Sequence, residues 1–272
     1  MADGEIIAIN YSRDVGWAGA IAAELCRDEP STVDVTFNYD GGSEIGVWQQ
    51  TLPADQFAHA LALIKRSGYA TLSGPTEVAP EQKFLALGER EQGAALPTVR
   101  CFELSSLHPT LSALSVEVER LLAGIRLHPL RVIHANAAWA KLAFDVSELL
   151  EIEMVLGNTG RLPLEMGNPL DVAAHGWNGL RLVLVDPAGF QHAIDLTPSH
   201  IRASPGLPLD ATVTLEPGKA LPFRIRKKVY LPPAQYSGRI EYHGIVENLE
   251  NRQLVTGSLS LDLGAVDIRS GG

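Results

Sequence analysis

The chain has 272 residues, of which 46% are hydrophobic and 20% are charged, and its formal net charge is −10 with a pI of about 5.3. This acidic balance argues against a general nucleic-acid binder, which needs a basic surface to displace counterions from phosphates. No stretch approaches the roughly 18 to 20 consecutive apolar residues of a membrane-spanning helix, so no membrane partner is expected. Single domains typically have about 100 to 200 residues, so two domains are expected.

The N-terminus and the cysteines bear on the cellular compartment. Residues 1–5 are acidic and lead straight into an apolar stretch, unlike a secretory leader, so we expect a cytoplasmic protein, or a periplasmic one if a leader has been removed. Cys26 and Cys101 are either a disulfide or, as we favour, two buried thiols. Neither has a second Cys or His at ligand spacing, and no metal or other cofactor is predicted.

The first half alternates strand and helix patterns. The clearest strand is Thr32 to Asp40, where every second residue is apolar, and Asp40-Gly41-Gly42 supplies the turn that follows. The other strand candidates are residues 5–11, 18–26, 47–52, 83–88 and 98–104.

Two helices are expected among these strands. The first runs from Pro53 to about Ser67, with Pro at its first position and Gly68 just past its end, and Phe57, Ala60, Leu61 and Ile64 form its apolar line. The second covers residues 109–127. Its apolar stripe is formed by Leu111, Leu114, Val118, Leu121 and Ile125. An α+β domain with an antiparallel sheet and two helices is therefore predicted for residues 1–127.

Residues 128–143 show no clear period and are interpreted as a linker. From residue 144 to residue 272 the pattern is of strands only, separated by turn signals such as Gly157-Asn158-Thr159-Gly160. Short strands at such spacing are typical of a β-sandwich, so we predict an all-β immunoglobulin-like sandwich that lacks the Cys and Trp hallmarks of antibody domains. The strand candidates are residues 147–156, 162–166, 179–185, 190–196, 211–215, 221–230, 236–246 and 253–263.

Two resemblances accompany this division. Leu215-Glu216-Pro217-Gly218 and Leu231-Pro232-Pro233-Ala234-Gln235-Tyr236 resemble the "L-x-P-G … L-P-P-G-x-Y" ending of bacterial immunoglobulin-like modules, including the intracellular proteinase-inhibitor family of bacilli, although Ala234-Gln235 replaces the usual Gly. In those modules the Tyr begins a core strand. Residues 5–105, with the turn Gly16-Trp17-Ala18-Gly19, are similar to emfourin-type inhibitors of thermolysin-like metalloproteases. No inhibitory residue is carried over from either family.

The sequence contains none of the common catalytic motifs. There is no helical His pair of a metalloprotease, no Gly-x-Ser-x-Gly elbow and no dinucleotide fingerprint, and the eight histidines are scattered. Glu148, Glu151 and Glu153 cluster where an acid and a base for glycoside cleavage would be imagined, but a solvated edge is the simpler interpretation. We therefore expect that the protein is not an enzyme.

Four residues are candidates for contact with a protein partner. Arg224, Arg226 and Lys228 alternate with apolar residues, so three cations project from one face of a strand. This row is either a protected sheet edge or an electrostatic binding surface for an acidic protein partner. Trp177, in a loop-like stretch, either anchors an interface or covers one end of the core.

These observations favour a non-catalytic bacterial protein that binds another protein, as a protease inhibitor or a toxin-neutralising immunity protein. The alternative is an enzyme or small-ligand-binding protein whose site lies in a cleft between the domains, lined by residues 127–142 with His128, His134 and Trp139. A structural spacer is a third hypothesis. The sequence leaves the oligomeric state open.

Overall fold

The computed structural model describes residues 6–14, 19–27, 30–38, 44–72, 83–168, 180–203, 212–248 and 253–270. These residues are mostly β-strand, with two α-helices, which agrees with the expected mixture of strands and helices at a coarse level. The chain divides into two compact units, unit 1 (residues 1–37 and 47–130) and unit 2 (residues 38–46 and 131–272). In the described part, neither helix is both long and apolar enough to cross a membrane.

Unit 1 is built on an antiparallel sheet with the strand order β2-β1-β5-β6. Its central strand β1 carries Tyr11, which is opposite Ala23 on one side and Leu87 on the other. The strands of the first half are β1 (Ile6–Asp14), β2 (Gly19–Cys26), β3 (Pro30–Asn38), β4 (Glu44–Thr51), β5 (Phe84–Glu91) and β6 (Thr98–Glu103). The predicted turns at residues 16–19 and 40–42 include residues outside the described ranges.

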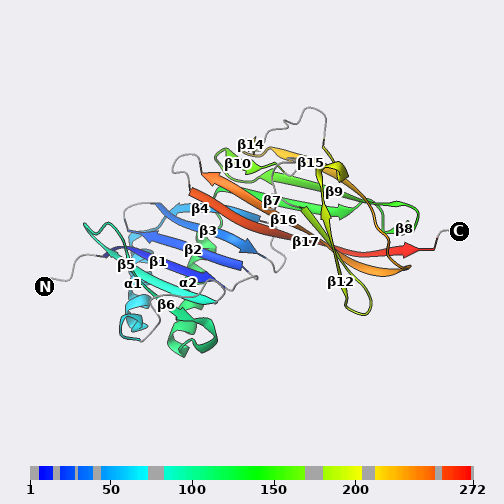
Figure 1. The fold of residues 1–272 in the computed structure, drawn as a ribbon. Coiled ribbons are helices and arrows are strands. Elements are labelled where there is room, and N and C mark those ends of the chain that lie inside the picture. Colours follow the sequence, from blue (N-terminus) through cyan, green and yellow to red (C-terminus); the bar gives the residue numbers. More distant parts are fainter. Residues whose placement is uncertain are drawn as a thin grey trace. The chain divides into compact units, whose positions relative to one another are not determined.

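Two helices accompany this sheet (Figure 1), as predicted: α1 (Ala54–Arg66) and α2 (Pro109–Ile125). Gly68, with φ of 66°, adopts the left-handed conformation just after α1. The apolar stripe of α2 is one residue different from the prediction, because Leu122 is buried whereas Leu121 is half-buried. Helical spacing admits either residue, and only the sheet decides which faces the core.

Helix α2 is tied to the sheet by one hydrogen-bonded cluster. The Tyr11 hydroxyl on β1 donates to Oε1 of Glu119 on α2 over 2.7 Å, and Arg13 reaches the same oxygen at 2.8 Å. Burial and the bond to Glu119 raise the pKa of Tyr11 well above its ordinary value. The tyrosine therefore stays protonated as a donor.

The two cysteines of unit 1 are not joined by a disulfide. Cys26 is buried at the end of β2, and Cys101 on β6 is partly exposed. Burial raises the pKa of the Cys101 thiol, which favours its protonated form at neutral pH.

Unit 2 contains an antiparallel ladder with the order β7-β9-β15-β13, which is called the outer sheet below. Its strands are β7 (Pro129–Trp139), β9 (Leu149–Asn158), β13 (Ile201–Ala203) and β15 (Ala220–Lys228). In β9 every second side chain is buried, so one face of the sheet is in the core and the other is open to solvent.

A second ladder of unit 2 is centred on β16, which pairs with β17 along its whole length. On its other side β16 pairs with β11 and then with β10, and these two pair in turn with β12 and β14, while β8 runs parallel to the end of β17. The strands are β8 (Ala143–Asp145), β10 (Leu164–Gly167), β11 (Leu180–Val185), β12 (Gln191–Leu196), β14 (Thr212–Leu215), β16 (Ala234–Asn248) and β17 (Gln253–Arg269).

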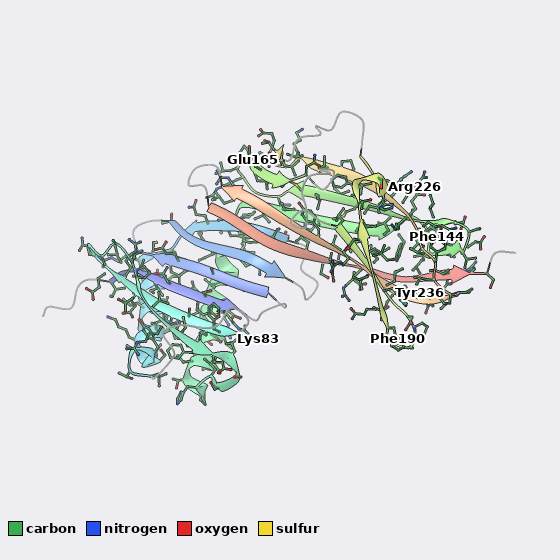
Figure 2. The ribbon with its side chains drawn as sticks, in the orientation of Figure 1. Lys83, Phe144, Glu165, Phe190, Arg226 and Tyr236 are labelled. Carbon is green, nitrogen blue, oxygen red and sulfur yellow. The ribbon has the colours of Figure 1, made fainter. Side chains whose placement is uncertain are left out.

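The two ladders of unit 2 meet at Trp139. This side chain, at the end of β7, is 8% exposed and lies so close to β16 that a Cβ atom built on Gly238 would overlap its Cζ2. Phe144 completes the contact as an edge-to-face ring with a centroid distance of 6.3 Å. Figure 2 shows Phe144 and Tyr236 within this unit. Gly238 is therefore needed to leave room for the indole ring of Trp139.

The segment predicted as a linker, residues 128–143, is largely the strand β7. Its residues 130–133 are all buried, so the first part of the strand shows no alternation, and alanine fills much of the rest. A strand that is buried on both faces has no period of two, which is why the sequence concealed it.

Candidate functional site

The solvent-facing side of the outer sheet gathers residues from three strands in register. Along β9, Gly157 lies between His134 and Ala220, and Val155 lies between Asn136 and Pro222. Further along, Glu153 lies between Ala138 and Arg224, and Glu151 is opposite Arg226. Since side chains of neighbouring strands in register point to the same side, these rows form one surface with small residues at one end and charges at the other.

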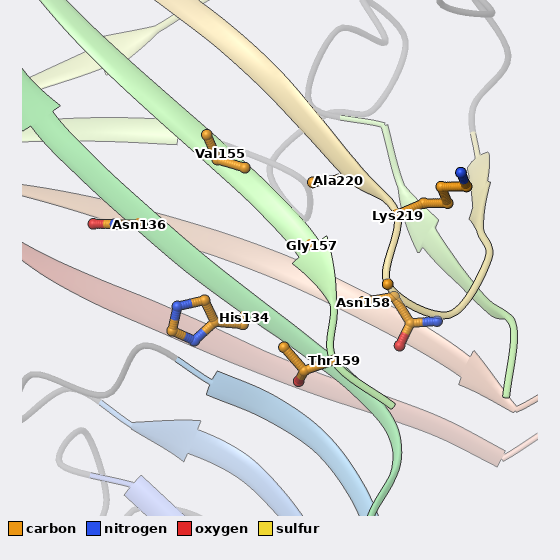
Figure 3. Close-up of a pocket in the computed structure, with 9 residues that line it drawn as sticks. His134, Asn136, Val155, Gly157, Asn158, Thr159, Lys219 and Ala220 are labelled. Atoms are coloured by element: carbon orange, nitrogen blue, oxygen red, sulfur yellow. The ribbon is translucent and has the colours of Figure 1, made fainter. Parts of the chain in front are cut away.

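The small-residue end of this surface is a hollow of about 400 Å³ (Figure 3). Its lining comes from β7, β9, the segment that follows β9, and the turn that leads into β15, so unit 2 alone supplies it. The lining residues are His134, Asn136, Val155, Gly157, Asn158, Thr159, Gly218, Lys219 and Ala220.

Asn158 fixes the rim of the hollow. Its side chain is buried, its Nδ2 donates to the carbonyls of Leu162 and Leu215 over 2.8 Å each, and its Oδ1 accepts from the Gly160 amide over 2.8 Å. Its backbone carbonyl accepts a bond from the amide of Gly218, which has φ of 71°. One buried amide thus joins the end of β9 to the turn after β14.

His134 borders the hollow beside a carboxylate. Its Nδ1 is buried and lies 3.4 Å from Oε1 of Glu44, although that nitrogen makes no hydrogen bond, while the side chain is 42% exposed. The exposure therefore lies on the remaining part of the ring. The approach of Glu44 depends on Gly46, whose φ is 149° and where a Cβ atom would overlap the carbonyl oxygen of Arg131.

The predicted cationic row on β15 carries its counter-charges on β9. Nη2 of Arg224 lies 2.6 Å from Oε1 of Glu153, and Arg226 lies 3.2 Å from Glu151. Nζ of Lys228 donates instead to the carbonyl of Val146. The row is thus a ladder of alternating charges, and pairing with β13 over Phe223–Ile225 places Arg224 inside the sheet and not at its edge.

The three clustered carboxylates are all engaged. Glu148, Glu151 and Glu153 pair with Lys141, with two arginines and with Arg224 respectively. The hydrogen bond from Lys141, helped by the Asp145 amide, lowers the pKa of Glu148. All three carboxylates face cations, whereas glycoside cleavage requires a protonated carboxylic acid opposite a second, free carboxylate.

The remaining predicted site residues are placed differently. Trp177 lies outside the described residues. Trp139, expected in a cleft, is buried in the core of unit 2. Among the described residues, no group of three His, Cys, Asp or Glu side chains converges on a common point as metal ligands would.

Sequence reasoning missed most of the hollow. It assigned Gly157 and Asn158 to a turn, whereas β9 continues through both. The signal was present in the Glu216-Pro217-Gly218 motif, because a left-handed glycine there turns the chain back onto Asn158. The pairing between these two segments depends on long-range register, which no local pattern reveals.

No protein-family model matches the sequence, and comparison with the curated proteins finds no match. Solved structures give distant likenesses only. A Northeast Structural Genomics Consortium target matches with TM-score 0.27 and 9% identity over 52% of this chain and 86% of its own. AggA, the major subunit of an Escherichia coli aggregative adherence fimbria, matches with TM-score 0.29 and 10% identity over 50% of this chain and 97% of its own.

A family 123 glycoside hydrolase from Clostridium perfringens also matches, with TM-score 0.27 and 14% identity over 51% of this chain and 27% of its own. At such TM-scores these likenesses carry no argument about fold or activity. The resemblances to immunoglobulin-like modules and to emfourin-type domains therefore stay predictions.

Proposed function

We propose that unit 2 is an immunoglobulin-like β-sandwich. The supporting observation is Tyr236, which is buried at the start of β16 and donates its hydroxyl to the carbonyl of Pro232, four residues upstream, over 2.9 Å. Immunoglobulin-like sandwiches use such a tyrosine corner, in which the hydroxyl returns to the backbone just before its strand. Burial raises the pKa of Tyr236, so it remains a donor.

We further propose that the protein is a non-catalytic protein-binding protein, of the inhibitor or immunity class, and that the solvent-facing side of the outer sheet is its binding surface. The observation that carries this proposal is the charge ladder of Arg224, Arg226, Glu151 and Glu153. Its charges are held in position by mutual pairing across the two neighbouring strands β9 and β15, and such order reduces the entropy lost on binding.

The charge ladder favours a partner whose own charges alternate over a partner that is uniformly acidic. Two arginines face two glutamates, so the cluster carries no net charge, and a partner gains attraction only where its own charges alternate in register with these. Complementary patterns of this kind confer specificity, because a wrong partner places like charges together.

The ladder is open to mutation because it contributes little to folding. The side chains of Arg224 and Glu153 are 52% and 57% exposed, and an exposed pair contributes about 0 to 1 kcal/mol. The double variant Arg224→Glu with Glu153→Arg keeps an opposite-charge pair but inverts the pattern that a partner meets. The matched control inverts the exposed pair Arg181 and Asp195 on β11 and β12, whose atoms are 2.8 Å apart.

The test uses the tagged full chain and the two inverted variants as baits in a bacterial lysate, with quantitative mass spectrometry of the captured proteins. We expect a protein that the unmodified chain and the Arg181/Asp195 variant retain but the Arg224/Glu153 variant loses. Capture that is equal for all three baits would refute the surface. Turnover of a small substrate by the purified chain would refute the non-catalytic class.

A further inference from the structure

Gly157 occupies a strand position where neither the backbone conformation nor the neighbouring atoms require a glycine. It lies in β9, its backbone is outside the left-handed region, and a Cβ atom built on it would lie 3.6 Å from the Ala220 Cβ and 3.7 Å from the Lys219 carbonyl oxygen, which are ordinary contact distances. Glycine weakens a strand by about 0.5 to 1 kcal/mol relative to alanine. Such a glycine often marks a place where a ligand or another backbone comes close.

The hollow above Gly157 has the size and the lining of a small-ligand site. Its volume of about 400 Å³ is within the range of roughly 300 to 1,000 Å³ of ligand pockets. Gly157, Ala220 and Val155 supply small or apolar surface, and Val155 is 39% exposed. Hydrogen-bonding groups of His134 and Asn136 border this surface from β7 (Figure 3).

The cation at this site is not neutralised. Lys219, which comes directly before β15, makes no ion pair with any residue in the described ranges, whereas Arg224 and Arg226 on β15 pair with glutamates. The carboxylate of Glu44 lies 3.4 Å from the buried Nδ1 of His134. On a chain of net charge −10, a lysine without a carboxylate partner favours an anionic ligand.

We propose that this hollow binds a small carboxylic acid that carries a ring or a short apolar chain. The apolar part lies over Gly157 and Ala220, and the carboxylate meets the ammonium of Lys219, whose flexible stem lets it follow the ligand. Asn136 borders the hollow from β7, on the other side of β9 from Ala220. This ligand site goes beyond the proposed partner-binding function and does not depend on it.

The test titrates the full chain with benzoate and, separately, with benzyl alcohol, which has the same ring without the charge. Binding is followed by amide chemical shifts in two-dimensional NMR spectra. We expect benzoate to shift the amides of Gly157, Gly218 and Ala220 in a saturable manner and benzyl alcohol to bind more weakly. Absence of saturable shifts at these amides with benzoate, or equal affinity for both probes, would overturn the proposal.

Variants connect the shifts to the hollow. Gly157→Leu places a side chain in the hollow and should abolish benzoate binding, whereas Ala138→Leu, on the same side of the sheet but outside the lining, should not. Lys219→Ala should weaken binding by about fivefold, as loss of an exposed ion pair does, and Lys83→Ala should leave it unchanged. If Gly157→Leu does not fold, the smaller substitution Gly157→Ala takes its place. Undiminished binding by a folded Gly157→Leu variant would overturn the proposal.

Discussion

Replacing Asn158 by alanine is expected to remove the hydrogen bonds that hold the rim of the hollow and to destabilise unit 2. The side chain makes three hydrogen bonds of 2.8 Å, two as a donor and one as an acceptor, at a residue that is 2% exposed. Each such bond contributes about 1 kcal/mol, and groups left unsatisfied in the interior cost about 1 to 3 kcal/mol. We therefore expect a loss of about 3 kcal/mol in the free energy of unfolding.

The loss is measured by urea unfolding with near-ultraviolet circular dichroism. The assay is paired with hydrogen exchange of the Gly160 amide, whose acceptor is Asn158 Oδ1. The midpoint of thermal unfolding should fall by several degrees, since about 1 kcal/mol corresponds to about 2 to 4 °C at this chain length. The matched control is Asn136→Ala, at an exposed amide of the same surface. A cost no larger than that of the control, with Gly160 still protected, would refute the reasoning.

Three further predictions concern unit 2. Gly238→Ala should displace the Trp139 ring and cost about 1 to 3 kcal/mol, with a shift in tryptophan fluorescence, and an unchanged spectrum would contradict the close contact. Tyr236→Phe should lose about 1 kcal/mol in urea unfolding, whereas no loss would contradict the corner. Burial and then Lys227 lower the pKa of His200, so stability should fall as pH drops below about 6.5, where the unfolded chain binds a proton that the folded chain resists. His200→Gln should lessen this fall between about pH 7 and pH 5, and equal pH profiles in urea unfolding would contradict it.

Residues that are close together in the sequence were sufficient to predict helix α1 and strands β9 and β15. Pro53 before α1 and Gly68 after it delimited the first helix, and alternation along β9 and β15 identified both strands. The sequence also placed Arg224 and Arg226 on one side of their strand. These features depend on neighbouring residues alone, so no knowledge of the tertiary structure was needed.

The site depends on pairings between distant segments and could not be predicted in this way. The partners of Arg224 and Arg226 lie more than 70 residues earlier in the chain, and a shift of one residue in register would turn them to the other side of the sheet. The first part of β7 was concealed because residues 130–133 are all buried, so His134 had no strand on which to be placed. The hollow exists only once all three strands are aligned.

The central claim is that the solvent-facing side of the outer sheet is the surface that binds a protein partner. Its most direct test is the affinity of the captured partner for the unmodified chain and for the Arg224/Glu153 inverted variant, measured by isothermal titration calorimetry. We predict that inversion weakens binding at least about tenfold, which is about 1.4 kcal/mol, whereas the Arg181/Asp195 inversion leaves it unchanged. Equal affinity for a correctly folded Arg224/Glu153 variant would contradict the claim.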